Sequence, residues 1–134
     1  MKIFSYIFTV LTDAIDLNGH VNNVTYLSWM IEAATKHSES VGFGHAACLD
    51  IGGTWVAKSH HIDYHKSAFE GDVLQMETWI DSIGKIMSKR CYRLTRLGDD
   101  TLICTGETEW VYVDSHKMRP TRIPISITDA FKSQ

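Results

Sequence analysis

One long helical segment followed mainly by strand-like segments is the feature of this sequence that most constrains its fold. Within residues 23–41, apolar side chains recur at helical spacing at Val24, Leu27, Ile31 and Ala34. Further aromatic and aliphatic residues widen this apolar stripe beyond that of a typical surface helix. We therefore expect one long helix that is largely buried.

Both ends of this helix carry recognisable boundary residues. Asn22 or Asn23 is suited to cap the N-terminus, because an asparagine side chain accepts a hydrogen bond from a free backbone N–H group. Gly42 or Gly44 is suited to end the helix, because glycine adopts the left-handed conformation without strain. A loop around residues 50–53 is expected next.

The remainder of the chain is rich in β-branched and aromatic residues, in segments separated by short turns. Short turns imply antiparallel neighbours, so the segments after the helix are expected to form a meander of four strands. Residues after Pro120 and Pro124 are expected to form an irregular tail. The predicted strands cover residues 3–11, 54–66, 72–83, 85–97 and 100–114.

These elements predict an α+β fold. One helix cannot cover both faces of a five-stranded sheet, so the sheet is expected to curl around the helix. The other sheet face or an edge strand is then free to contact a second copy of the chain. We expect a single domain over residues 1–134 and a homo-oligomer.

Composition narrows the function classes. With 134 residues, of which 44% are hydrophobic, the chain is able to bury one ordinary core. Its net charge of -3 argues against nucleic acid as the main partner. No apolar segment approaches the roughly 20 residues of a membrane span. Cys48, Cys91 and Cys104 are odd in number and widely spaced, which indicates reduced thiols and a cytoplasmic protein.

Polar residues gather just before the predicted helix. Asp16 stands three residues before Gly19 and seven before Asn23, in a turn that leads to the helix N-terminus. Free N–H groups there are able to bind an oxygen that becomes negative during a reaction. A carboxylate beside such donors is the smallest set of groups that acyl transfer requires. His20 is placed to orient a water molecule or the carboxylate. The alternative is that these residues only shape a turn and cap a helix.

The sequence resembles a known family in three stretches. They are "DLNGHVNNVTYLSWMIEAA", "HIDYHKSAFEGDVLQMETWI" and "RCYRLTRLGDDTLICTGETEWVYVDSHKMRPTRIP". Together they are similar to the 4-hydroxybenzoyl-CoA thioesterase-like branch of the hotdog-fold superfamily, over nearly the whole chain. The resemblance implies a hotdog fold, with a long central helix wrapped by a five-stranded antiparallel sheet. It also implies hydrolysis of an acyl-CoA thioester to free acid and coenzyme A.

The resemblance further implies roles for the residues of the turn. Asp16 is the catalytic carboxylate, as nucleophile or as base for the attacking water, and the backbone N–H of Asn23 holds the carbonyl oxygen. His20 supports Asp16. The site is expected between subunits of a homodimer or homotetramer. The residues that build the turn are Asn18, Gly19 and Asn22.

The substrate is expected to be an acyl-CoA or an acyl group on an acyl-carrier protein. No metal and no separate cofactor are implied, because coenzyme A is part of the substrate. The basic stretch "KIMSKRCYRLTR", residues 85–96, offers cations for its phosphates. The expected substrate-binding residues are Tyr26, Trp29, Trp55, Tyr64, Lys89 and Arg90.

Some alternatives stay open at this point. Glu32 is a second carboxylate candidate, because other hotdog thioesterases carry a catalytic acid on the central helix. His61, Asp63 and His65 alternate along one predicted strand, where a metal site is a further hypothesis. A dehydratase or hydratase on the same fold and a non-catalytic acyl-binding protein are the alternative functions.

Overall fold

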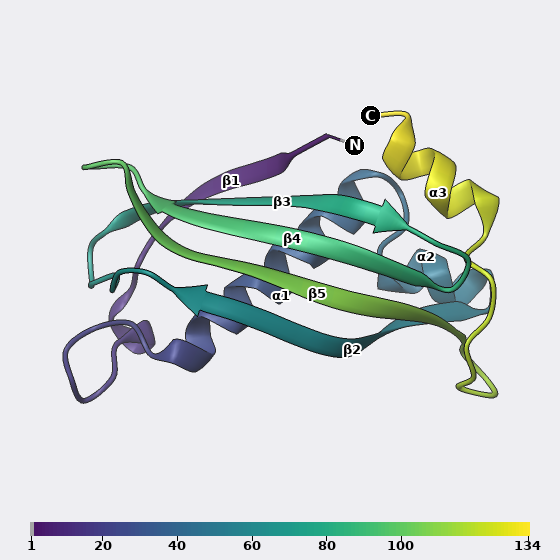
Figure 1. Ribbon diagram of the computed structural model, residues 1–134, viewed down its shortest axis with the longest axis horizontal. Coiled ribbons are helices and arrows are strands. Elements are labelled where there is room, and N and C mark those ends of the chain that lie inside the picture. The colour runs from purple at the N-terminus through teal and green to yellow at the C-terminus, as the bar shows by residue number, and fades with distance from the viewer. Residues whose placement is uncertain (1) are drawn as a thin grey trace.

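The computed structural model describes residues 2–134, so Met1 of the expected domain lies outside the described residues. Within this range the chain forms a five-stranded antiparallel sheet in the order β1-β3-β4-β5-β2, with one long helix against one face (Figure 1). The predicted architecture of one long helix and five strands is thereby confirmed. The strands are β1 (Phe4–Thr9), β2 (Gly53–Tyr64), β3 (Val73–Ile83), β4 (Met87–Arg96) and β5 (Thr101–Asp114).

Helix α1 (Asn23–Ser40) begins at the predicted residue and ends within one residue of the predicted boundary. The Asn22 side chain caps it by accepting a hydrogen bond from the Val24 N–H at 2.8 Å. At the other end Gly42 has φ of +87°, its N–H donates to the Glu39 carbonyl, and the Phe43 N–H donates to the Ser38 carbonyl. This pair of bonds is a Schellman motif, which requires a left-handed residue at Gly42.

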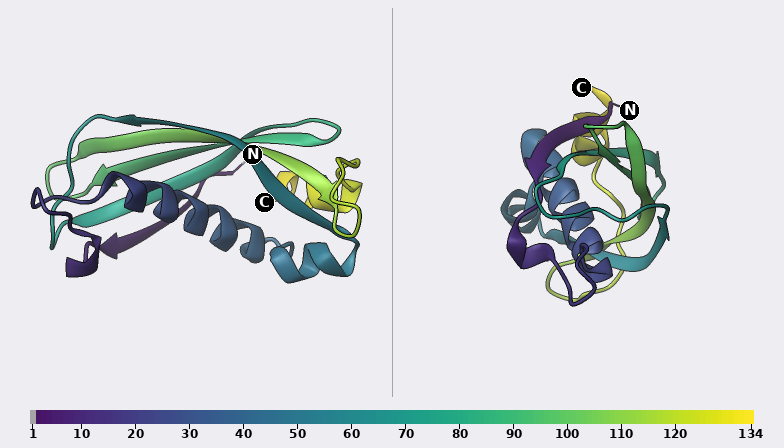
Figure 2. Two further views of the ribbon diagram at one scale, coloured as in Figure 1. Left: turned by 90° about the horizontal axis from the view of Figure 1, so that it is seen from below. Right: turned by 90° about the vertical axis from the view of Figure 1, so that its left-hand side faces the viewer.

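The sheet curls around α1, as Figure 2 shows. Side chains along β4 alternate between buried and half-buried positions, so one face of the strand packs on the core and the other faces outward. The register shifts by one residue between Ala57 and Ser59 in β2 and between Ile80 and Ser82 in β3. Such bulges increase local twist and help a sheet to bend.

The predicted four-strand meander is wrong in one respect. β2 pairs with β5 at the edge of the sheet and not with β3, so only β3, β4 and β5 form a meander. β3 pairs instead with β1, which occupies the other edge of the sheet. Residues 65–72 carry the chain across the end of the sheet, from one side to the other (Figure 1).

Two helices were not predicted. Helix α2 (His45–Asp50) precedes the expected loop, and α3 (Ile125–Lys132) replaces the expected irregular tail. Pro124 is the N-cap of α3, because proline is tolerated at a helix start although it breaks a helix interior. Ile127 and Phe131, four residues apart, bury one face of α3. A short 3-10 turn, η1, covers Thr12–Ala14.

Helix α1 is not largely buried in the single chain. Its buried side chains include Tyr26, Met30 and Ala33, whereas Val24 is 71% and Ile31 37% exposed. The apolar stripe is therefore wider than the surface that the sheet covers. Among the described residues, none of the helices combines the length and the apolar character needed to cross a membrane.

Candidate active site

Asp16 opens a tight hairpin that ends at the start of α1. Its N–H donates to the His20 carbonyl at 2.9 Å, and its carbonyl accepts from the Gly19 N–H at 3.1 Å. Ile15 and Val21 pair as an antiparallel bridge beside it. Gly19 has φ of +82°, the left-handed conformation that closes a three-residue hairpin loop. The glycine is thus required by the geometry of the turn.

The two oxygens of the Asp16 carboxylate have different environments. Oδ1 accepts a hydrogen bond from the Asn18 N–H at 2.8 Å, whereas Oδ2 lies 3.7 Å from Nδ1 of His20. The Asp16 side chain is 22% exposed. One oxygen is therefore fixed by the turn, and the other is available to attack a carbonyl carbon or to accept a proton from water.

The hairpin is joined directly to the N-terminus of α1. The Asn22 N–H donates to the Ala14 carbonyl at 2.9 Å, and Asn23 is the first residue of the helix. No helical turn precedes Asn23 to accept its N–H, so this group is free to bind an oxygen. The Tyr64 hydroxyl donates to the Asn23 carbonyl at 3.1 Å and ties β2 to the helix start. The structure therefore brings together the whole predicted turn.

The loop at residues 65–72 is hydrogen-bonded to this hairpin and supports it. The Val21 N–H donates to the Ala68 carbonyl at 2.9 Å, and the Ala68 N–H donates to the Tyr26 hydroxyl at 3.0 Å. Burial raises the pKa of Tyr26, so the phenol stays neutral at physiological pH. This support was not predicted, because no local signal shows that a loop so far along the chain returns to the turn.

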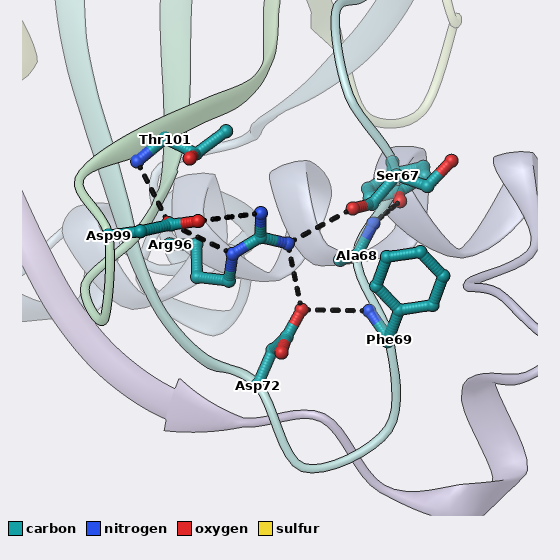
Figure 3. Close-up of polar contacts among 8 residues, drawn as sticks. Ser67, Ala68, Phe69, Asp72, Arg96, Asp99 and Thr101 are labelled. Carbon is teal, nitrogen blue, oxygen red and sulfur yellow. Dashed lines mark hydrogen bonds and ion pairs between the residues drawn. The ribbon is translucent and has the colours of Figure 1, made fainter.

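Arg96 fixes the same loop to β4, as Figure 3 shows. Its Nη1 donates to the Ser67 carbonyl at 3.2 Å and to Asp72 Oδ2 at 3.1 Å, and both carboxylate oxygens of Asp99 accept from the guanidinium. Asp72 Oδ2 also accepts from the Phe69 N–H at 2.9 Å. Arg96, part of the predicted phosphate-binding stretch, is therefore engaged in holding the loop.

The four aromatic residues that were expected to bind substrate lie in two different places in the chain. Trp29 packs edge-on against Phe8, with ring centroids 4.9 Å apart, and Tyr26 and Tyr64 lie near the start of α1. Trp55 packs against Tyr112 in a second core cluster. Trp55 therefore packs away from Trp29 within the single chain, and the assignment of the four aromatic residues to the substrate stays a prediction.

Lys89 and Arg90, the two basic residues expected to bind substrate, lie on opposite faces of β4. Lys89 forms an ion pair with Glu107, at 3.0 Å, on the outer face of the sheet. Arg90 points to the inner face, where it is buried and donates to Nδ1 of His37 at 2.8 Å. Neighbouring residues of a strand point to opposite faces, so the two cations cannot converge.

The remaining candidate residues have partners other than Asp16. Glu32 is exposed, and its Oε1 lies 3.7 Å from Nζ of Lys36, with which it forms an ion pair. It lies about 13 Å along α1 from Asn23, at a helical rise of about 1.5 Å per residue. His61 lies 3.3 Å from Asp63, but His65 pairs with Thr105 instead. Within residues 2–134 no group of three His, Cys, Asp or Glu side chains is arranged to hold a metal.

Comparison with solved structures defines the class of fold. The 1,4-dihydroxy-2-naphthoyl-CoA thioesterase from Synechocystis superposes with a TM-score of 0.89 at 18% identity, covering 98% of this chain and 96% of that one. A DHNA-CoA thioesterase from Staphylococcus aureus gives a TM-score of 0.89 at 19% identity, covering 99% and 91%. The predicted hotdog fold is confirmed.

Sequence comparison then gives the family. Residues 10–131 match the thioesterase-like superfamily, and the chain belongs to it. Acyl-CoA thioester hydrolase YbgC of Escherichia coli O157:H7 is 25% identical over 130 residues, which cover 97% of this chain and 96% of that protein. The chloroplastic oleoyl-acyl carrier protein thioesterase 2 of Arabidopsis thaliana is 27% identical over 130 residues, covering 92% of this chain. This chain spans only 35% of that plant relative's length.

Proposed function

We propose that the protein hydrolyses an acyl-CoA thioester to a free carboxylic acid and coenzyme A. The observation that carries the proposal is the Asp16 hairpin, in which one carboxylate oxygen is fixed by the Asn18 N–H and the other lies 3.7 Å from Nδ1 of His20. The same hairpin leads directly to the N-terminus of α1. Membership of the thioesterase-like superfamily supports the reaction class.

In the proposed reaction the thioester carbonyl oxygen lies at the backbone N–H of Asn23. Oδ2 of Asp16 either attacks the carbonyl carbon or removes a proton from a water molecule that attacks it. The negative oxygen formed in the tetrahedral intermediate is stabilised by the N–H and by the positive end of the helix dipole. Collapse of the intermediate breaks the C–S bond, and the departing thiolate takes up a proton.

The two routes differ in the number of chemical steps. Direct attack by Asp16 leaves a mixed anhydride, which a water molecule then hydrolyses to free acid and the original carboxylate. Attack by water gives the acid without a covalent intermediate on the protein. In both routes His20 acts on Asp16 as a positioning residue, because its Nδ1 lies 3.7 Å from Oδ2.

The acyl pocket is proposed to be completed by a second subunit. In the single chain Asp16 lines neither the cavity beside the second half of α1 nor the cavity between β1 and α1. Coenzyme A is the proposed carrier of the acyl group. YbgC, which is named as an acyl-CoA thioester hydrolase, supports this choice because it matches this chain over nearly its full length. An acyl-carrier protein is the second carrier to test, because the plant relatives are named for it.

The test is release of free thiol from a panel of aromatic, short-chain and long-chain acyl-CoA substrates. We expect Asp16→Asn to lower kcat by about a hundredfold or more, since the amide is neither a nucleophile nor a base. Asp13→Asn is the matched control, because Asp13 is a nearby exposed carboxylate outside the hairpin.

Circular dichroism and thermal unfolding establish that both variants are folded. Full activity in Asp16→Asn would place the chemistry elsewhere, with Glu32 as the next carboxylate to substitute. Binding of acyl-CoA without cleavage by the wild-type protein, with acyl-carrier substrates also intact, would favour a non-catalytic acyl-binding protein.

A further inference from the structure

A separate cavity lies at the opposite end of α1 from the Asp16 hairpin. It has a volume of about 190 Å³ and is lined by residues of the second half of α1, of α2, of α3 and of the adjoining part of the sheet. Figure 1 shows that α2 and α3 lie at the same end of the sheet. This volume corresponds to roughly six water molecules of liquid. Its apolar walls include Phe43, Trp55, Ile80, Trp110 and Phe131. Polar side chains also line it, namely those of Thr35, Ser38, His45, Thr54 and Ser88.

One charged side chain, Arg90, lines this otherwise largely apolar cavity. Arg90 is only 4% exposed, and its guanidinium lies over the Phe131 ring with 5.7 Å to the centroid. Its Nη1 donates to Nδ1 of His37 at 2.8 Å and to the Thr78 hydroxyl at 3.2 Å. Both acceptors are uncharged, because a histidine nitrogen that accepts a hydrogen bond belongs to the neutral ring.

Within the described part of the chain, no acidic group forms an ion pair with this guanidinium. None of the carboxylates in residues 2–134 lies within ion-pairing distance of Arg90, whereas Lys89, Arg93 and Arg96 on the same strand all have acidic partners. Burial lowers the pKa of Arg90 to about 10, so the side chain is still charged at neutral pH. A buried charge without a counter-ion destabilises a fold, and a bound anion would relieve that cost.

The geometry of the free donors indicates the ligand class. The hydrogen bonds that the Arg90 side chain makes with residues 2–134 all start at Nη1, which leaves Nε and Nη2. A guanidinium edge with two parallel donors matches the two oxygens of a carboxylate. The surrounding aromatic side chains suit an apolar body attached to that carboxylate.

We propose that this cavity binds a small monocarboxylic acid with an apolar body, with the carboxylate on Arg90 and the body among Phe43, Trp55 and Ile80. The site is separate from the Asp16 hairpin, because the first α1 residue of the cavity, Ile31, lies about 12 Å along the helix from Asn23. The proposal does not depend on the hydrolase function.

The experiment titrates the wild-type protein with benzoate and hexanoate, and separately with the neutral analogues benzamide and hexanamide, by isothermal calorimetry at pH 7.5. We expect at least one acid to bind saturably and at least about tenfold more tightly than its amide, the effect of a charge-assisted hydrogen-bonded pair. Arg90→Met is expected to abolish this preference, while Lys89→Met, on the outer face, is expected to keep it.

The wild-type comparison of acid with amide decides the proposal even if Arg90→Met does not fold. Absence of saturable binding of either acid, equal binding of acid and amide, or an unchanged preference in folded Arg90→Met would each overturn it. Competition by inorganic phosphate as effective as the acid itself would also overturn it, because phosphate has no apolar body. Asp16→Asn is expected to bind the acid normally, which separates this result from the thioesterase test.

Discussion

His37 is a buried histidine whose two nitrogens both have defined partners. Nδ1 accepts a hydrogen bond from Arg90, and Nε2 pairs with Oε1 of Gln134 at 2.9 Å. This arrangement fixes the neutral ring with the proton on Nε2. Burial lowers the pKa of His37, and the Arg90 charge lowers it further, although the Gln134 hydrogen bond acts in the opposite direction. Protonation would place a second N–H against the guanidinium.

We therefore predict an acid-sensitive contribution of His37 to stability. Because its pKa is lower in the folded than in the unfolded chain, the unfolded chain binds the proton first as pH falls. The contribution of His37 to the free energy of unfolding is complete when the pH is above the ordinary histidine pKa of 6.5. It is lost as the pH falls toward the lower pKa that His37 has in the folded chain. The slope for one proton approaches about 1.4 kcal/mol per pH unit.

Urea unfolding of the wild-type protein and of His37→Gln between pH 7.5 and 5 measures this effect. Glutamine does not titrate, so the free energy of unfolding of the variant should fall less steeply with acid than that of the wild type. Parallel curves for the two proteins would show that His37 does not carry the dependence.

At the scale of elements, the C-terminal end of α1 is defined by the Schellman motif at Gly42. Gly42 has φ of +87°, and an added Cβ there would meet no heavy atom within 4 Å. The backbone conformation alone therefore disfavours a side chain. We predict that Gly42→Ala lowers the free energy of unfolding by about 1 kcal/mol, measured by urea unfolding.

Gly98 provides the matched control for this substitution. It also has no heavy atom within 4 Å of an added Cβ, but its φ lies outside the left-handed region. Gly98→Ala should change stability by no more than a few tenths of a kcal/mol, or raise it slightly by restricting the unfolded chain. Equal losses for the two variants would mean that the left-handed conformation is not the cause.

At the scale of the whole molecule, two surfaces of the single chain are left uncovered: one side of α1 and the outer edge of strand β2. On one side of the helix the apolar residues Val24 and Ile31 are exposed, together with the small polar residues Ser28 and Thr35. β2 lies at the edge of the sheet, with β5 on one side only. Exposed apolar stripes and long edge strands are characteristic of surfaces that a second subunit covers.

We predict a homodimer that covers this stripe, with a mass twice that of the chain in sedimentation equilibrium at micromolar concentration. Ile31→Glu should weaken the dimer at least about tenfold, because it places a charge in an apolar contact. Ile125→Glu is the control, since Ile125 is 70% exposed on α3. A monomeric wild type, or a dimer equally stable in Ile31→Glu, would contradict the prediction.

The elements were largely predictable because their signals are local. The helix from Asn23 and the five strands are indicated by hydrophobic period and turn residues. Asn22 has a side chain suited to cap a helix, and Gly42 lacks the Cβ that disfavours the left-handed conformation at a helix end. The Asp16 turn was likewise found from adjacent residues. Helix α3 was missed because its burial depends on Ile127 and Phe131 packing on a distant part of the core.

The sequence alone determined the helix, the strands and the composition of the turn that carries Asp16, because each depends on residues close together in the chain. The tertiary structure decided that β2 pairs with β5, that Ala68 and Arg96 support the turn, and that Arg90 points inward without a counter-ion among residues 2–134. These features depend on contacts between residues far apart in the chain. No local pattern specifies which distant strand becomes a neighbour, so only the assembled sheet reveals them.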